Sequence, residues 1–296
     1  MGLEVLDVDL RSLVRRYPLV VYFGLAYALS AVALIVIGFP DLSGRTPVPS
    51  SSFVMFPLLV IGVGTSGVAL TALAAGTRGV RELAQRITRW RLGRWAFALL
   101  IPPLGITGVL FAFKTLGSPV FAQQLTLGFA LFGVGIGLVA GFFEEIGWTG
   151  FAYPRLSSRL GAFGGALLLG VLWGIWHFPV VDSLGAASPH GAYLPEYFAA
   201  FVAAMVAMRV LIAWLYTNTG SVLAAQLMHA CSTASLVALS APHVSAAQEA
   251  LWYAAYAGLL WVIVAVVVAR FGVSLQRRPR SEDPAPNLGR VQSTVG

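Results

Sequence analysis

The chain of 296 residues is 58% hydrophobic and only 10% charged, with a mean hydropathy of +0.81. Soluble domains carry about 25% charged residues, so this composition excludes a fold that covers itself with a solvated surface. It indicates a protein of the lipid bilayer. The net charge of +7 comes mainly from arginines beside apolar segments, which favours anionic lipid headgroups and argues against nucleic acid as a partner.

Eight apolar segments have about the length that a transmembrane helix needs, roughly 20 residues. The first is longer than the ~7–15 apolar residues of a signal peptide, so we interpret it as a membrane helix that is retained. The sequence therefore predicts an all-α, polytopic bundle of about eight transmembrane helices in the cell membrane. The segments are 17–39, 53–75, 95–113, roughly 124–156, 160–180, 196–217, 220–240 and 250–270.

Basic residues are distributed unevenly between the two sides of this topology. Arg45 and Lys114 lie on one side, and Arg209 lies within a span. All other arginines flank the side that holds both termini. By the positive-inside rule we expect both termini in the cytoplasm, with anionic lipid at this basic face.

The chain divides into four regions by composition. Within the first, an amphipathic segment places Leu83 and Ile87 on one helical face and arginines on much of the rest. We expect it to lie along the membrane surface; a plain basic loop is the alternative. The regions are 1–123, with N-terminal transmembrane helices and the basic amphipathic segment 77–94; 124–240, the core that carries the polar residues; 241–275, the last transmembrane helix; and 276–296, a disordered basic tail.

Ionisable residues inside a span are costly and therefore mark a candidate site. Gly133, Gly137 and Gly141 recur every four residues as a face for close helix packing, and Glu145 continues that face. Glu144 and Glu145 could instead end the helix at the membrane surface. If the helix continues through both to about position 158, Glu144 lies roughly 21 Å deep.

Two later spans carry polar residues at helical spacing. His177 ends a small-residue face of one span, while Gln226, His229 and Thr233 form a polar stripe on another. An interfacial histidine in an aromatic belt and simple interhelical hydrogen bonding are the alternatives. Only the long form of the glutamate helix places Glu144 in the same layer as both histidines.

These residues form three motifs in separate spans. Glu144-Glu145 comes first, Trp173-x-x-x-His177 second and His229-x-x-x-Thr233 third. The series resembles the motifs EExxxR, FxxxH and HxxxN of the CAAX prenyl protease and bacteriocin-processing (CPBP or Abi) family of intramembrane peptidases. The resemblance covers roughly residues 125 to 240.

The chain departs from the family pattern at two positions. Thr149 stands where the family has arginine, and Thr233 stands where it has asparagine. The first departure leaves Glu145 without its usual cation in a medium where an unpaired charge is costly. We therefore expect Arg209 or Arg155 to contact Glu145 or Glu144.

The resemblance implies an intramembrane endopeptidase, described for the family as a metalloprotease, that cleaves a membrane-associated peptide or protein. Hydrolysis needs an activated water and a stabilised oxyanion. Glu144 is the expected general base, His177 holds the water and Glu145 orients the site. His229 with Thr233 faces the oxyanion.

Three questions stay open at the level of sequence. One is whether zinc, held by His177, His229 and Glu144, takes part, since two histidines and a carboxylate are an acceptable ligand set. A second is whether the two threonines make the protein a non-catalytic scaffold or pseudopeptidase. A third and less favoured interpretation is a proton-coupled transporter, because intramembrane Glu, Arg and His also mark ion pathways.

Overall fold

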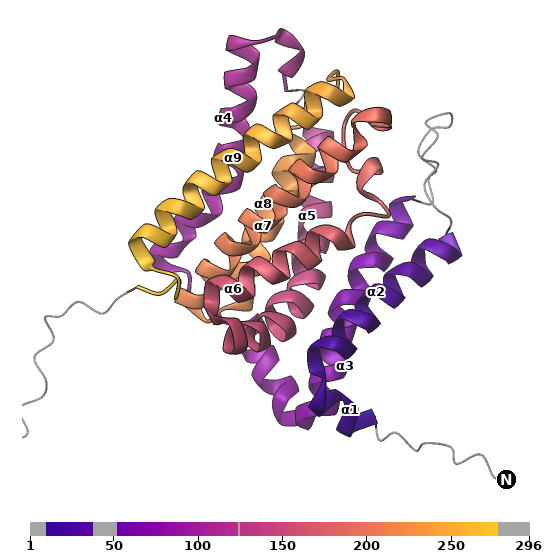
Figure 1. Cartoon of the computed structure of the whole chain (residues 1–296), viewed down its shortest axis with the longest axis vertical. Helices are drawn as coiled ribbons and strands as arrows, with labels where there is room; N and C mark the ends of the chain where they lie inside the picture. Colours follow the sequence, from indigo (N-terminus) through magenta and orange to yellow (C-terminus); the bar gives the residue numbers. More distant parts are fainter. Residues whose placement is uncertain (1–9, 38–51, 124, 278–296) are drawn as a thin grey trace, which may run out of the picture.

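A computed structural model describes residues 10–37, 52–123 and 125–277, and all regular structure in these ranges is helical (Figure 1). This confirms the all-α prediction. The eight long helices are α2 (Pro18–Ile37), α3 (Ser52–Ile87), α4 (Ile101–Leu116), α5 (Leu127–Gly147), α6 (Tyr153–Trp176), α7 (Leu194–Thr219), α8 (Val222–Ala238) and α9 (Ala246–Phe271). The short ones are α1 (Leu10–Arg16), η1 (Gly93–Leu100), η2 (Pro119–Phe121), the π-helix η3 (Trp148–Ala152), η4 (Val181–Ser183) and η5 (Gly191–Tyr193).

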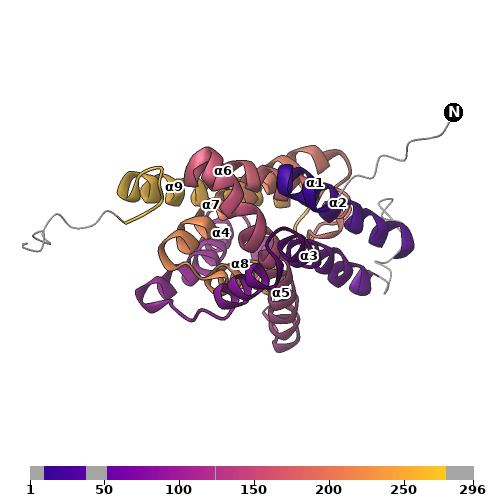
Figure 2. The same cartoon turned by 90° about the horizontal axis from the view of Figure 1, so that it is seen from below.

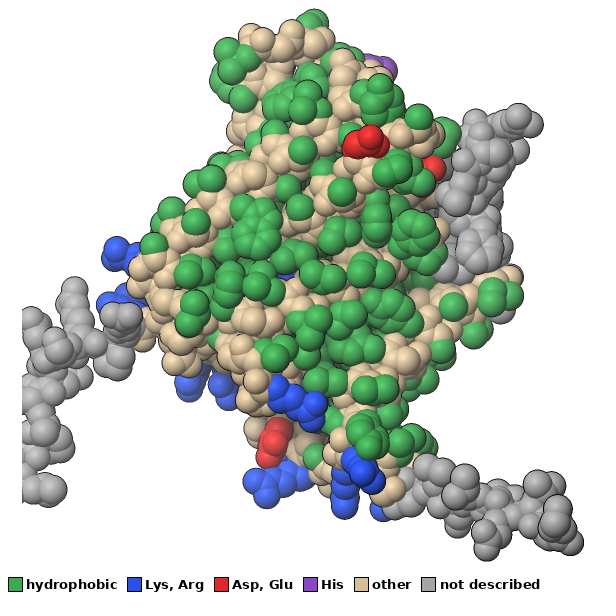
Figure 3. Space-filling model, in the orientation of Figure 1, with side chains coloured by type: hydrophobic (Ala, Val, Ile, Leu, Met, Phe, Trp, Pro, Cys, Tyr) green, Lys and Arg blue, Asp and Glu red, His purple; other side chains and the backbone are tan. Residues whose placement is uncertain are grey.

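The helices have the length and composition of a multi-pass membrane protein. In the described ranges, five helical stretches are long and apolar enough to span a bilayer, with Leu127–Trp176 counted as one stretch, and α2 and α8 contribute shorter apolar helices. Figure 3 shows hydrophobic side chains over the middle of the visible face and Lys and Arg at its lower end. We refer to that end as the basic end. Its placement in the cytoplasm stays a prediction, as does the four-part division of the chain.

Small residues set the spacing between α5 and α8, which pack side by side. A Cβ atom on Gly133 would come within 2.7 Å of the Ala234 carbonyl oxygen, and one on Gly137 within 2.5 Å of the Ala230 oxygen. No larger side chain fits between backbones this close. The glycine repeat therefore brings the glutamates of α5 next to His229 of α8.

Helix α7, most of whose residues are buried, packs against α6, α8 and α9 (Figure 2). Helix α6 packs along α7, where a Cβ atom on Gly170 would lie 2.8 Å from Cα of Val206. Helix α9 packs along α7 as well. The pair α2–α3 joins the bundle through α3 and α5, where Gly67 lies directly against the Gly147 backbone.

The chain remains helical beyond the two glutamates. Helix α5 continues through the π-turn η3 into α6, and Gly161, with φ 72° and ψ 168°, then reverses the chain. Only glycine adopts this backbone conformation readily. The long form of the glutamate helix is thus confirmed. Glu144 and Glu145 are 1% and 0% exposed, so they do not end a helix at the surface.

The basic amphipathic segment continues α3 after a break at Gly76, where φ is 62°. Its Leu83 is 1% exposed and packs against Gly150 of η3, while Trp90 is 72% exposed. Part of the apolar face therefore contacts protein where the sequence predicts a membrane surface. Of the predicted tail 276–296, the structure describes only Gln276 and Arg277, and the rest lies outside the described residues.

A buried ion cluster fixes the loop between α6 and α7 at the end opposite to the arginines. His190 Nδ1 lies 2.7 Å from Asp182 Oδ1, and Nε2 lies 3.1 Å from Glu249 Oε2 on α9. Glu249 also accepts the backbone N–H groups of residues 186 and 187. The His190 ring stacks on Tyr197 at 3.7 Å. The sequence analysis did not find this cluster, because its members are far apart in the chain.

The cluster makes stability depend on pH. Burial lowers the pKa of His190, but the hydrogen bonds to Glu249 and Asp182 outweigh burial and raise the pKa above its ordinary 6.5. Because the raised pKa belongs to the folded state, the stabilisation is complete below pH ~6.5 and is lost as pH rises through the folded-state pKa. We expect a lower thermal unfolding midpoint in detergent at pH 9 than at pH 6. His190→Gln should remove most of this difference, and His243→Gln, which changes an exposed loop histidine, should not.

Candidate active site

Glu145 of α5 and Arg209 of α7 form a fully buried bidentate ion pair. Arg209 Nη1 donates to Oε2 and Nη2 donates to Oε1, both at 2.8 Å. The guanidinium also lies over the Trp173 ring, 4.3 Å from its centroid. The predicted contact between an arginine and a glutamate of the pair is confirmed for Arg209. Arg155 instead donates to the Phe151 carbonyl and lies over its ring.

Thr149, one turn after Glu145, completes the surroundings of this pair. Its hydroxyl donates a short hydrogen bond to Glu145 Oε2 and lies 3.3 Å from Arg209 Nη1, which donates to it. The small side chain leaves room for the guanidinium that enters from α7. Thr149 thus serves as a polar neighbour of the pair, while the cation itself comes from another helix.

The ring of His229 on α8 is oriented by Glu145. Its Nδ1 lies 2.8 Å from Glu145 Oε1, so Nδ1 carries the proton and donates it. Both oxygens of Glu145 are therefore occupied, one by Arg209 and Thr149 and the other by Arg209 and His229. This carboxylate holds other groups in place and has no free oxygen for a proton of its own.

Glu144, its neighbour in sequence, has neutral partners only. Its Oε2 accepts hydrogen bonds from the indole Nε1–H of Trp173 at 2.7 Å and of Trp148 at 3.1 Å. Adjacent residues on a helix point about 100° apart, which gives the two carboxylates separate environments. The sequence analysis missed Trp148, and it named Trp173 as a motif position without predicting its contact with Glu144. Their spacing was the signal: Trp148 is four residues after Glu144, and Trp173 is four before His177.

His177 lies at the C-terminal end of α6. Its Nδ1 lies 2.9 Å from the Trp173 carbonyl oxygen, which can only accept, so Nδ1 carries the proton. Trp173 also contacts the His229 ring at 4.9 Å between centroids. One indole thus touches both histidines and donates to Glu144, and it is the common neighbour of the three residues that the motifs predict.

Three polar atoms of the site keep no hydrogen-bond partner in the described part of the chain. They are Oε1 of Glu144, Nε2 of His177 and Nε2 of His229. None is among the polar atoms that are wholly enclosed without a partner, although the three side chains are nearly buried. One acid oxygen and two imidazole nitrogens of the motif residues are therefore left without a protein partner among the described residues.

The π-turn η3 directly follows the two glutamates. Its wider backbone leaves the Gly150 carbonyl to accept a hydrogen bond from Arg86 Nη2 at 3.0 Å, and Arg86 Nη1 donates to the Tyr216 hydroxyl. Single π-turns inside α-helices occur frequently at functional sites. The amphipathic segment that carries Arg86 thus supports the backbone beneath the site.

Comparison with known proteins identifies a family that part of this chain resembles. Residues 126–235, which run from just before α5 into α8, match the family model of the type II CAAX prenyl endopeptidases, Rce1-like. This segment, which holds all three motifs, is similar to that family. A 44-residue stretch is 46% identical to CAAX prenyl protease 2 of Methanococcus maripaludis; it covers 15% of this chain and 16% of the relative's length. The resemblance that the three motifs predict is confirmed.

One role predicted for this segment, that of Thr233, has no supporting contact in the part of the chain that the structure describes. Thr233 lies one turn after His229 on α8 and has no hydrogen-bond partner among the described residues, so its part in binding an oxyanion stays a prediction. Nor do any three His, Cys, Asp or Glu side chains in those residues converge closely enough to hold one ion. Zinc binding by Glu144, His177 and His229 stays a prediction, and we derive no step through a metal.

The Glu145–Arg209 pair should dominate the stability of the Rce1-like segment. Removal of one partner leaves a buried, uncompensated charge, so Arg209→Ala should lower the free energy of unfolding by about 3–5 kcal/mol. Glu145→Ala should cost a similar amount, and the double variant should lose little more than either. Unfolding in detergent measures all three. Arg155→Ala is the control; losses that simply add in the double variant would contradict the coupling.

Proposed function

We propose that the protein is a CAAX-type intramembrane endopeptidase in which Glu144 activates the water that attacks the peptide bond. The observation that carries this proposal is that Glu144 Oε1 and the Nε2 atoms of His177 and His229 have no protein partner among the described residues, while Trp173 contacts all three residues. These residues occupy the motif positions of an Rce1-like segment.

The partners of the two carboxylates determine which one acts as the base. Glu145 is saturated by a cation and an imidazole, and any proton on it would break the buried ion pair. Glu144 is held by two neutral indoles through Oε2 only, so Oε1 can take a proton from water without loss of a hydrogen bond. General-base catalysis of this kind contributes about 10²–10⁴-fold to a rate.

The two histidines have different tasks in this mechanism. His177, with its proton on Nδ1, offers the lone pair of Nε2 to the hydrogen of the attacking water. His229 donates from Nε2 to the developing oxyanion when both of its ring nitrogens carry a proton. The site thus has an acceptor for water and a donor for the carbonyl oxygen.

The substrate in this proposal is a membrane-associated peptide. An apolar groove of about 680 Å³ between α2 and α6 includes Trp176 and Phe178, the neighbours of His177 in the chain. An apolar groove suits a substrate that carries a lipid or enters from the bilayer. The name of the Methanococcus relative makes a prenylated C-terminal CAAX peptide the first substrate to test.

The decisive experiment compares Glu144→Gln with the unaltered protein on a farnesylated CAAX peptide. The amide keeps the volume and an oxygen for the indoles but cannot take a proton from water. We expect release of the C-terminal tripeptide, measured by mass spectrometry, to fall roughly 10²–10⁴-fold. Glu82→Gln, which breaks an exposed ion pair at the basic end, is the control and should retain activity. Equal, measurable rates for the two proteins would contradict the role of Glu144, and no release by the unaltered protein would favour the pseudopeptidase interpretation.

The same assay tests whether a metal ion takes part in the reaction. Because the described residues hold no group of three suitable ligands, we expect tripeptide release to persist in 1,10-phenanthroline. The matched control is 1,7-phenanthroline, an isomer that does not chelate. Loss of activity with the chelating isomer alone, restored by added zinc, would contradict a metal-free mechanism.

A further inference from the structure

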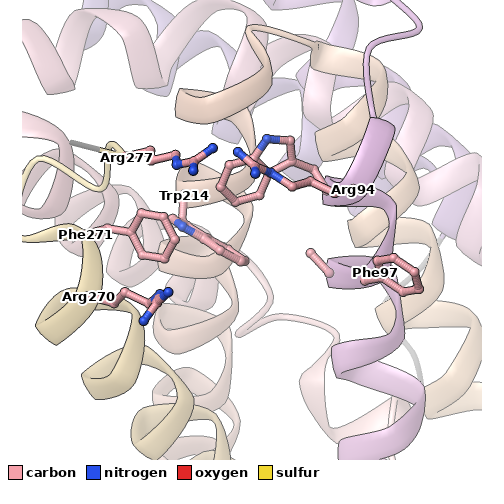
Figure 4. A pocket seen from close by; sticks show the side chains of 8 residues that line it. Arg94, Phe97, Trp214, Arg270, Phe271 and Arg277 are labelled. Carbon is pink, nitrogen blue, oxygen red and sulfur yellow. The ribbon is translucent and has the colours of Figure 1, made fainter. Parts of the chain in front are cut away.

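A second pocket lies at the basic end of the bundle, where η1, α7 and the end of α9 meet. Its volume is about 520 Å³. Figure 4 shows that three arginines reach into its surroundings from different elements: Arg94 from η1, Arg270 from α9, and Arg277 from the segment after α9. Trp214 and Phe271 form the floor between them. None of these side chains belongs to the candidate active site.

The three arginines are brought together without a compensating acid. Among the described residues, no carboxylate pairs with any of them, and the ion pairs that do occur involve other arginines or histidines. Like charges that face one pocket repel one another, whereas an anion that binds there accepts charge-assisted hydrogen bonds from several guanidinium groups. The positive charge of the pocket is therefore suited to binding an anion.

The position of Arg277 is fixed by its backbone. Asn218, near the end of α7, accepts the Arg277 N–H at 3.1 Å through Oδ1 and donates to the Leu275 carbonyl at 2.7 Å through Nδ2. The turn after α9 is thus attached to α7, and it holds this arginine at the pocket. Arg94 is held from the other side, 5.6 Å above the ring of Trp95.

The rest of the pocket is aromatic and apolar. Trp214 packs edge-on against Trp95 at 5.2 Å and against Phe271 at 5.4 Å. Trp214 Nε1 is enclosed and has no hydrogen-bond partner in the described part of the chain, so the indole contributes ring surface to the pocket and no accessible donor. Beside the arginines, Phe97 is 75% exposed and Leu104 farther along α4 is 66% exposed. The charged donors of the pocket thus lie beside an apolar track, formed by the exposed side chains of Phe97 and Leu104.

We propose that this pocket binds the phosphodiester headgroup of an anionic phospholipid from the surrounding membrane. The arginines face the phosphate oxygens, and the acyl chains lie along Phe97 and the exposed side of α4. A free phosphate would use the same donors but would leave the apolar track uncovered. Basic pockets between membrane helices are known to hold such headgroups. This inference is independent of the proposed peptidase function.

The test uses the full chain reconstituted into phosphatidylcholine vesicles with increasing amounts of brominated phosphatidylglycerol. Bromine atoms quench nearby tryptophans, and Trp95 and Trp214 line the pocket. We expect quenching that saturates at a low mole fraction of the anionic lipid, and weaker quenching by brominated phosphatidylcholine at equal mole fraction. Arg94→Gln combined with Arg277→Gln should shift the half-saturation point roughly tenfold upward.

The control is Arg81→Gln combined with Arg91→Gln, which removes the same charge from exposed positions at the same end but outside the pocket. Its half-saturation point should change by less than about twofold. Equal shifts in both double variants would overturn a defined site, as would equal quenching by the two brominated lipids. Relief of quenching by inorganic phosphate would identify a soluble anion as the occupant and overturn the lipid assignment. Thermal unfolding establishes that both variants are folded.

Discussion

The buried contact between Glu145 and Arg209 determines the arrangement of everything around it. A carboxylate and a guanidinium without solvent are stable together only if additional hydrogen bonds satisfy most of their remaining donors and acceptors, and among the described residues only Arg209 Nε of this pair has none. Here Thr149 and His229 supply further hydrogen bonds, and Trp173 supplies an aromatic face for the cation. Because these groups come from α5, α6, α7 and α8, one ion pair fixes the relative rotation of four helices.

The ion pair also explains how two adjacent glutamates come to differ. Glu145 is committed to charged partners, while Glu144 is positioned by indoles that compensate its charge only in part. Neutral donors orient a carboxylate and leave its second oxygen available for a proton. The difference between a structural and a reactive acid thus arises from the kinds of donors around each one. Both are equally buried.

Much of this arrangement was predictable from the sequence, for identifiable reasons. The spans follow from hydropathy, the close packing of α5 against a neighbouring helix from the Gly133, Gly137 and Gly141 repeat, and the Arg209 contact from the cost of unpaired charges in a membrane. Each of these arguments needs only the residue spacing within one segment or the free-energy cost of one buried charge. The motif resemblance supplied the order of Glu144, His177 and His229.

What was not predictable depends on contacts between distant segments or on a backbone irregularity. The π-turn η3 has no marker in the sequence, and the support that Arg86 gives to Gly150 follows only once that turn exists. The His190 cluster joins a loop to the start of α9, more than fifty residues away. The helical spacing of Leu83 is the same whether its face contacts lipid or packs against another helix. The sequence analysis therefore placed it against the membrane surface, whereas it packs against the π-turn.

The exchange of an arginine on α5 for one on α7 has a consequence for assembly. With the family's arginine at position 149, α5 would carry its own counter-charge, four residues from Glu145 on the same helix. In this chain α5 has two carboxylates and no cation of its own, at a cost of about 3 kcal/mol for each charge in the bilayer. Compensation depends on a helix that begins 47 residues after α5 ends. Neutralisation of α5 is therefore a late, tertiary event, and the reactive centre cannot exist in a half-inserted chain.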